Sequence, residues 1–288
     1  MEAFFHSDDF TLIHGDCFEV LKGLKDVDMV FADPPYFLSN DGLTIQSGKI
    51  VSVNKGKWDK LEGSMHDFNY QWISLAKNAL KPNGTIWISG TMHNIFSIYE
   101  VLKELNFKIL NVITWRKLNP PPNFSCRTFT HSTEIIIWAR KEQKVAHYYN
   151  YDLMKKLNGG KQMTDVWQLP AIARWEKSCG KHPTQKPLGV LARLIQASTK
   201  PDAWILDPFS GSATTGIAAN LLGRRYLGLE LYDDFLSISK ARREEIDNIS
   251  VRSEYLKKLT KTKMIAPSNN YIVAEELGHN YGVPWLYE

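Results

Sequence analysis

Short apolar runs along this chain alternate with segments in which apolar residues recur every three or four positions. The runs have the length and the β-branched and aromatic content of buried strands, at residues 11–14, 29–32, 85–89, 110–115, 133–139, 204–207 and 226–230. The other segments have helical spacing, at residues 17–24, 68–80, 95–105 and 214–222, after Pro187 and up to Ile246. Strands that alternate with helices predict an α/β fold in which helices cover both faces of a mostly parallel sheet.

The remaining segments are polar and lack this periodicity. Residues 37–60 are rich in Ser, Gly, Asn and Lys and predict a mobile loop. Residues 81–84 read Lys-Pro-Asn-Gly and predict a turn, and residues 141–181 predict an irregular basic segment. We therefore predict one domain over residues 1–249 and a polar C-terminal extension over residues 250–288.

The composition excludes several classes of protein. Hydrophobic residues make up 43% of the chain and charged residues 23%, and the longest apolar run, Ile135–Ala139, is far shorter than the ~20 residues that cross a bilayer. The N-terminus lacks the apolar stretch of a secretory signal. Three cysteines without a CxxC pair argue against a disulfide framework or a zinc site. We expect a cytoplasmic protein with no metal and no membrane partner.

The net charge of +4 is mild, but its distribution is uneven. Residues 141–181 contain eight Lys and Arg against four Asp and Glu, together with several Tyr and Trp residues. Basic groups neutralise phosphates, and aromatic rings stack on bases. The same composition is also found on ordinary solvated surfaces, so charge alone leaves both interpretations open.

The first candidate site follows the strand that ends at Asp207. This strand runs into a turn of small residues around Gly211 and then into a helix, whose free backbone N–H groups favour an anion. Glu230 ends the next predicted strand, nineteen residues after Gly211, where a carboxylate can accept hydrogen bonds from both hydroxyls of a ribose. An ordinary glycine turn before a helix is the alternative.

Other uses of this loop require residues that it lacks. Gly211 and Gly216 have the spacing of a phosphate loop, but Ile217 and Ala218 stand where Lys and Ser or Thr are required. The dinucleotide fingerprint GxGxxG is absent. Ser210 lacks the flanking glycines of a hydrolase nucleophile. A nucleotide triphosphatase is therefore excluded, and a dehydrogenase or a hydrolase is disfavoured.

The second candidate site is Asp33-Pro34-Pro35-Tyr36, directly after a buried strand. Open α/β sheets bind ligands at this end of their strands. The two prolines restrict the backbone, so that the carboxylate and the aromatic ring keep a set separation. This arrangement suits a site that holds a planar group between a ring and a hydrogen-bond acceptor. A strand that ends at a proline beside a solvated Asp is the alternative.

Three motifs together resemble the amino-methyltransferases that modify adenine N6 in DNA: DPPY at 33–36, KHPTQKP at 181–187 and DPFSGS at 207–212. Their order resembles the β group of that family, and the resemblance covers residues 11–246. It implies a Rossmann-like fold and S-adenosylmethionine as the methyl donor. Residues 119–134 and the Trp58-Asp59 loop resemble the second methyltransferase of restriction systems that act on GATC. Ala213 departs from the family, which more often has Gly there.

The resemblance implies a catalytic role for Asp33, Pro34, Pro35 and Tyr36. Asp33 and the Pro34 carbonyl would each accept one hydrogen of the adenine amino group, which frees the nitrogen lone pair to attack the sulfonium methyl group. Tyr36 would stack on the target base once the base has left the duplex.

The resemblance also implies a set of cofactor-binding residues. Glu230 would bind the ribose of the cofactor, and Asp16 would bind its adenine amino group. Thr184, Gln185 and Lys186 would bind its amino-acid end. Asp16 has a second interpretation, as the cap of the helix that follows it. The predicted set comprises Asp16, Cys17, Asp33, Thr184, Gln185, Lys186, Asp207, Phe209, Ser210, Gly211, Ser212, Thr214, Thr215 and Glu230.

By the same resemblance, residues 141–181 are a target-recognition segment, assisted by the loops 37–60 and 119–131. We predict DNA contacts from Asn123, Arg127, Arg174 and Lys177, with double-stranded DNA as the substrate and single-stranded DNA as a further one. The resemblance further implies a homodimer and a cognate restriction endonuclease that acts separately.

Other functions remain open at this point. Cytosine-N4 methylation uses the same attack, but the family usually has Ser in place of Asp33 for that product. A catalytically silent subunit that binds DNA for a partner is a second alternative, and the intact DPPY motif argues against it. Methylation of RNA or of a protein glutamine is a third; look-alike enzymes that modify glutamine typically have Asn at position 33.

Overall fold

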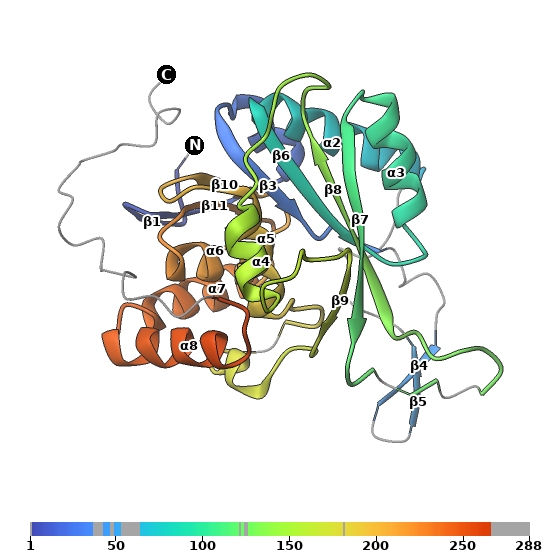
Figure 1. Ribbon diagram of the computed structural model, residues 1–288, viewed down its shortest axis with the longest axis vertical. Coiled ribbons are helices and arrows are strands. Elements are labelled where there is room, and N and C mark those ends of the chain that lie inside the picture. The colour runs from blue at the N-terminus through green and yellow to red at the C-terminus, as the bar shows by residue number, and fades with distance from the viewer. Residues whose placement is uncertain are drawn as a thin grey trace.

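The computed structural model describes residues 2–36, 43–46, 49–52, 64–120, 122–123, 126–180 and 182–265, with residues 43–52 described by their backbone only. Its main sheet has nine strands in the order β1-β2-β11-β10-β3-β6-β8-β7-β9 (Figure 1). The strands are β1 (Phe5–Ser7), β2 (Phe10–His14), β3 (Val27–Ala32), β6 (Leu80–Gly90), β7 (Lys108–Lys117), β8 (Thr133–Arg140), β9 (Val166–Leu169), β10 (Trp204–Asp207) and β11 (Arg225–Glu230). Five of its eight strand pairs are parallel.

Helices cover both faces of this sheet, as Figure 1 shows. The helices are α1 (Cys17–Val20), α2 (Met65–Ala79), α3 (Ile95–Glu104), α4 (Tyr151–Leu157), α5 (Leu188–Ser198), α6 (Thr214–Leu221), α7 (Asp233–Glu245) and α8 (Ile249–Lys261). Buried residues of α1 to α3 form one core cluster, and those of α5 to α8 form the other. The predicted α/β fold with a mostly parallel sheet is confirmed.

Strand β3 shows how the sequence builds the two faces. Side chains alternate across a strand, so that Met29 and Phe31 join the α5–α8 cluster while Val30 and Ala32 join the α1–α3 cluster. All four are at most 2% exposed. A strand segment buried on both faces must be apolar, which is why residues 29–32 are all apolar and the chain becomes polar again at Asp33, directly after the strand ends.

Several predicted elements differ in detail from those observed. The predicted helix 17–24 is a single α-helical turn, α1, followed by a 3-10 helix at Leu21–Gly23. The predicted turn at 81–84 lies inside β6 as an irregularity in its pairing with β3. In the predicted loop 37–60, residues Leu43–Gln46 (β4) and Lys49–Ser52 (β5) pair as an antiparallel hairpin, and the other residues of that loop lie outside the described ones.

The prediction of an irregular segment over residues 141–181 is wrong. This segment contains α4, the strand β9 and a 3-10 helix at Arg174–Lys177. β9 pairs in parallel with β7 and extends the main sheet by one strand. Its residues Trp167 and Leu169 are buried in the core, because their alternation with polar neighbours fits an edge strand with one buried face.

The predicted boundary at residue 249 falls at the start of α8. Tyr255, Leu259 and Ile265 are buried in the α5–α8 core cluster, so the packed domain continues at least to residue 265. The rest of the predicted extension, residues 266–288, lies outside the described part of the chain.

Candidate active site

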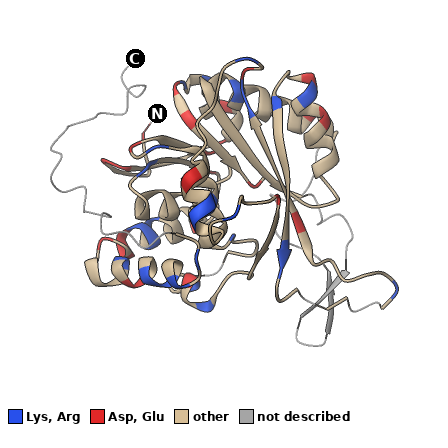
Figure 2. Cartoon of the chain, viewed as in Figure 1, with Lys and Arg blue, Asp and Glu red and all other residues tan. Residues whose placement is uncertain are grey.

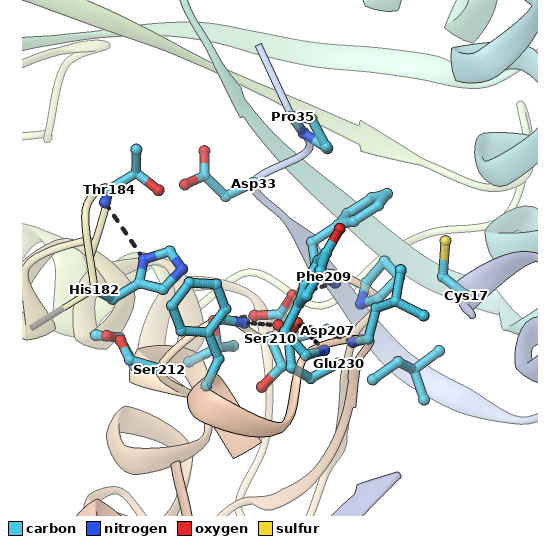
Figure 3. Close-up of a pocket in the computed structure, with 18 of the residues that line it drawn as sticks. Cys17, Asp33, Pro35, His182, Thr184, Asp207, Phe209, Ser210, Ser212 and Glu230 are labelled. Atoms are coloured by element: carbon cyan, nitrogen blue, oxygen red, sulfur yellow. Dashed lines mark hydrogen bonds between the residues drawn. The ribbon is translucent and has the colours of Figure 1, made fainter. Parts of the chain in front are cut away.

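Four parallel neighbours, β2, β11, β10 and β3, end at the same edge of the sheet. The loops that follow them surround a cavity of about 220 Å³. Figure 3 shows side chains of these loops directed toward it. The cavity is lined by Gly15, Asp16, Cys17, Phe18, Phe31, Asp33, Pro35, Phe68, His182, Thr184, Gln185, Lys186, Asp207, Pro208, Phe209, Ser210, Gly211, Ser212, Thr214, Thr215, Leu229, Glu230, Leu231, Tyr232 and Phe235.

The loop between β10 and α6 is held by Asp207, the last residue of β10. The carboxylate of Asp207 accepts hydrogen bonds from the Phe209 N–H, at 3.0 Å, and from the Thr215 hydroxyl, at 2.6 Å. Burial raises the pKa of Asp207 to about 7. Because both partners lie within eight residues of Asp207, this part of the site forms from a single short segment.

Gly211 and Ala213 give this loop its tight curvature. Both have positive φ, at 52° and 51°, in the left-handed region that glycine adopts without strain. A Cβ at Gly211 would come within 3.1 Å of the His182 ring, so any larger residue would press against this imidazole. Burial lowers the pKa of His182 to about 4, and a neutral imidazole therefore faces the cavity.

Glu230 connects the ends of β11 and β10. One carboxylate oxygen accepts from the Gly211 N–H, at 2.8 Å, and the other from the backbone N–H groups of Leu231 and Tyr232, at 2.9 and 3.0 Å. Burial raises the pKa of Glu230, while these backbone donors act in the opposite direction. A carboxylate has about four acceptor positions, and these three hydrogen bonds leave capacity for one further donor.

Gln185 carries an acceptor without a partner. Its side-chain nitrogen donates to the Glu176 carbonyl, at 2.8 Å, which fixes the orientation of the amide. Its oxygen Oε1 is buried and has no hydrogen bond among the described residues. Since an unpaired buried acceptor is costly and Gln185 lines the cavity, the arrangement fits a ligand that supplies a donor, such as an ammonium group.

Asp33 lies in a cluster of charged side chains at the other end of the cavity. Its oxygen Oδ1 accepts from the Tyr36 hydroxyl, at 2.7 Å, and Oδ2 accepts from the Lys186 ammonium, at 2.5 Å. Lys186 also donates to the Tyr36 hydroxyl, at 3.0 Å. Glu134 lies 3.5 Å from Lys186 and 2.6 Å from Lys117.

Burial and charge act in opposite directions in this cluster. Burial raises the pKa of Asp33, and the Lys186 ammonium opposes this shift. Burial disfavours the charge of Lys186, yet the carboxylates of Asp33 and Glu134 hold its pKa well above the ordinary value. Likewise, Lys186 and Lys117 outweigh burial and hold the pKa of Glu134 below its ordinary value. The cluster therefore consists of paired charges.

All fourteen predicted cofactor-binding residues line this one cavity. Lys186, predicted to bind the amino-acid end of the cofactor, lines the cavity and also contacts Asp33 and Tyr36. The Tyr36 hydroxyl is bonded to Asp33, and neither Tyr36 nor Pro34 is among the described residues that line the cavity. Asp16 caps α1 through the Phe18 N–H, at 2.8 Å, and also lines the cavity. The individual roles of these residues stay predictions.

Sequence reasoning missed Glu134 and Lys117. They come from β8 and β7, more than eighty residues after Asp33 in the chain. The one available signal is that Glu134 directly precedes an apolar run at the start of a buried strand. It also missed the aromatic rings of Phe68 and Phe235, which line the cavity.

The predicted DNA-contacting residues lie on two separate segments. The loop between β7 and β8 carries the exposed Arg127 and also Asn123, whose side-chain nitrogen donates to Thr128. Arg174, exposed, and Lys177, half-buried, belong to the 3-10 helix before α5. Figure 2 shows basic residues near the end of β7 and in the loop that follows it.

Among the described residues, no helix is long and apolar enough to cross a membrane. In the same part of the chain, no group of three His, Cys, Asp or Glu side chains is arranged to hold a metal ion.

Comparison with known proteins shows what the chain is similar to. Residues 27–241 match the family described as DNA methylase. The chain is 58% identical over 267 residues to the Type II methyltransferase M2.MboI of Moraxella bovis, across 91% of this chain and 97% of that protein. It is 55% identical over 248 residues to the Type II methyltransferase M2.DpnII of Streptococcus pneumoniae, across 84% of this chain and 92% of that protein.

Solved structures show the same relationship. The crystal structure of the M1.HpyAVI–SAM complex superposes with a TM-score of 0.62 at 30% identity, over 81% of this chain and 98% of that one. The cytosine-N4-specific PvuII DNA methyltransferase superposes with a TM-score of 0.67, over 91% and 95%. Its identity is 18%, so this second match shows the shared fold alone.

Proposed function

This chain belongs to the DNA methylase family, and from that premise we propose that it transfers a methyl group from S-adenosylmethionine to the exocyclic N6 of an adenine in DNA. One observation carries the proposal: Asp33, of the intact DPPY motif, lines the same cavity as the Gly211 loop and Glu230. An acceptor for an amino group and a built cofactor pocket thus share one enclosed space.

The chain's part in the chemistry begins at Asp33. An adenine amino group is a poor nucleophile because its lone pair is delocalised into the ring. Asp33 and the Pro34 carbonyl would each accept one amino hydrogen, which draws the nitrogen toward a tetrahedral geometry and frees that lone pair. Fixing the nitrogen in line with the methyl donor supplies much of the rate, since oriented reactants avoid a large entropy cost.

The residues of the cavity fit S-adenosylmethionine. When bound, this cofactor supplies an electrophilic methyl group on a sulfonium centre. Glu230 and Asp16 present carboxylates for the ribose and the adenine, and the unpaired Gln185 oxygen fits the ammonium of the methionine part. The tight Gly211 turn lets the backbone approach a ligand closely. The chemistry requires no metal.

In the proposed reaction, Tyr36 exchanges its hydrogen bond for contact with the base. Its hydroxyl is bonded to Asp33, whereas its proposed role is to stack on the extruded adenine. Extrusion costs a few kcal/mol of stacking and pairing, which the Tyr36 face and basic contacts to the backbone would offset. An incoming base would displace the Tyr36 hydroxyl and so free one oxygen of Asp33.

The similar proteins suggest the biological setting. The chain is more than half identical to two enzymes named as second Type II methyltransferases, and its sequence resembles those of GATC systems. We therefore propose that it methylates the adenine of GATC in double-stranded DNA, with single-stranded DNA as a further substrate. It would protect cytoplasmic DNA from a separate endonuclease, and it would act as a homodimer.

Expression in a host without adenine methylation tests this function. Mapping of modified bases across the host genome should find N6-methyladenine at GATC and nowhere else. The Asp33→Ala variant, made at the same level, should leave the genome unmodified. N4-methylcytosine in place of N6-methyladenine would instead establish the cytosine alternative, which the Asp at position 33 disfavours. An unchanged pattern with Asp33→Ala would contradict the proposed mechanism.

A further inference from the structure

Two charged residues near Lys186, namely Glu134 and its partner Lys117, have no role in the proposed function as described above. We infer that Glu134, anchored by Lys117, is a positioning residue that fixes the Lys186 ammonium on one oxygen of Asp33 and keeps the other oxygen available to the adenine amino group. This inference rests on the proposed methyl transfer and adds two residues to it.

The geometry is a line of alternating charges that runs from the sheet into the site. Lys117 ends β7, and its ammonium lies 2.6 Å from Glu134, near the start of β8. The second oxygen of Glu134 lies 3.5 Å from Lys186, whose ammonium lies 2.5 Å from Asp33. The Lys186, Glu134 and Asp33 side chains are only 8%, 11% and 14% exposed.

The composition of this line explains why it is stable. It contains two cations and two anions, so its net charge is zero. A buried charge that loses its partner is strongly destabilising, and each member therefore depends on its neighbours. Lys117 and Glu134 also lie at the two ends of the loop from β7 to β8, which carries two of the predicted DNA contacts.

The ammonium of Lys186 donates hydrogen bonds to Asp33, at 2.5 Å, and to the Tyr36 hydroxyl, at 3.0 Å. The Glu134 oxygen Oε2 lies 3.5 Å away, in an ion pair without a hydrogen bond, and has no hydrogen-bond partner among the described residues. The negative charge of Glu134 attracts the ammonium and opposes its movement toward Asp33. Without this pull, Lys186 can move across the carboxylate and engage both oxygens, which would block the position that the adenine amino group needs.

The arrangement also separates the two partners of Asp33. Tyr36 holds Oδ1, and Lys186 holds Oδ2. When Tyr36 leaves to stack on a base, Oδ1 becomes free while Lys186 stays in place. The ammonium then keeps the carboxylate ionised as an acceptor at the moment when substrate excludes water from it.

The Glu134→Gln variant tests the inference, because it keeps the shape of the side chain and removes its charge. We expect kcat to fall about 10- to 100-fold, as for other small misplacements of a reacting group, while the KM for S-adenosylmethionine and the Kd for DNA change less than about twofold. The measurement is steady-state methyl transfer to a GATC duplex between pH 5 and 9.

The pH profile gives a readout that a purely structural role would not move. The titratable groups that face Asp33 are Tyr36, Glu134, Lys186 and, from β10, Asp207. Glu134 disfavours ionisation of Asp33 through its negative charge. Its removal should therefore shift the acidic limb of kcat to lower pH, even though kcat itself falls. Glu134→Asp, which keeps the charge, should leave this limb in place and recover activity to within a few-fold of wild type.

Asp28→Asn is the matched control. Asp28 lies on the same strand as the residues before Asp33 and forms a partly buried ion pair with Lys81, at 2.7 Å, away from the cavity. This variant should lose thermal stability but keep kcat and the acidic limb. The inference is overturned if Glu134→Gln matches wild type in kcat and pH profile, if Glu134→Asp shifts the acidic limb or recovers no activity, or if Asp28→Asn reproduces the same changes. Failure of the proposed function is distinct, because wild type itself would then form no N6-methyladenine.

Discussion

The two ends of the cavity stabilise their carboxylates in different ways. At the cofactor end, Asp207 and Glu230 are bonded mainly by backbone N–H groups and by a hydroxyl of the same local segments. At the catalytic end, Asp33 is held by the side chains of Tyr36 and Lys186, and Lys186 is in turn held by Glu134. One end is thus built from backbone groups and the other from charged side chains.

This difference has consequences for both stability and chemistry. Backbone donors are fixed once the loop is formed, which suits a pocket that must keep one shape. Side-chain partners can exchange, which suits an acceptor that must release Tyr36 before it binds a base. Substitutions at the catalytic end should therefore change the rate, whereas substitutions at the cofactor end should change cofactor affinity and stability.

Asp33→Ala gives the sharpest test of this difference. We expect kcat to fall at least about 10³-fold, because the amino group loses its oriented acceptor, while the Kd for S-adenosylmethionine stays within about threefold. Radiolabelled methyl transfer and calorimetry measure the two quantities. A variant that keeps a tenth of the wild-type rate would contradict the assignment of Asp33.

Glu230→Ala should have the opposite profile. It leaves the N–H groups of Gly211, Leu231 and Tyr232 without their acceptor, at a cost of about 1–3 kcal/mol. We expect the Kd for S-adenosylmethionine to rise about 10- to 100-fold, with a lower Tm and a nearly normal kcat at saturating cofactor. Calorimetry and thermal unfolding provide the measurements. An unchanged Kd would remove Glu230 from the cofactor site.

Asp207→Asn tests the cofactor end through pH. The folded pKa of Asp207 is about 7, above its ordinary value of 3.8, so between these values the folded state binds more protons than the unfolded state. Stability from this group is thus fully present below about pH 4 and decreases as pH rises toward 7.

The asparagine variant lacks this dependence. Its Tm relative to that of wild type should therefore rise between pH 4 and pH 7. The corresponding change in the free energy of unfolding is on the order of 1 kcal/mol or more. Differential scanning calorimetry of both proteins at each pH measures this change. A constant difference would show that Asp207 is ionised throughout.

Ala213→Gly should have the smallest effect. Ala213 has φ of 51°, which costs a non-glycine residue about 1–2 kcal/mol. Glycine relieves this strain but loses about 0.8 kcal/mol of methyl burial and gains freedom in the unfolded chain. The net change in stability should stay within about 1 kcal/mol by chemical denaturation. Ala213→Val, as the contrasting variant, should be clearly destabilised, because a β-branched residue is poorly tolerated at positive φ.

The sequence predicted the cofactor end better than the catalytic end, because the contacts of the cofactor end are mostly local in the chain. Asp207, Gly211 and Thr215 lie within nine residues, so that their spacing alone implies a turn before a helix. The predicted role of Lys186 depended on the motif around it, but its partners in the structure are Asp33 and Glu134, from distant strands. Nothing in the local sequence marks that pairing.

The irregular segment predicted at 141–181 teaches a similar lesson. Its strand β9 is four residues long, too short for its alternation to stand out among polar neighbours. It becomes a strand because β7 offers it a free edge, and an edge is a property of the assembled sheet.

The sequence by itself determined the strands and helices with a clear periodicity and the two strand-end motifs, since these depend on side-chain spacing and on the backbone preferences of Gly and Pro over a few residues. Only the tertiary structure decided that Lys117, Glu134 and Lys186 meet behind Asp33. Electrostatic pairing acts through space and requires only that two groups be close, so residues that are far apart in the chain carry no trace of it until the sheet brings them together.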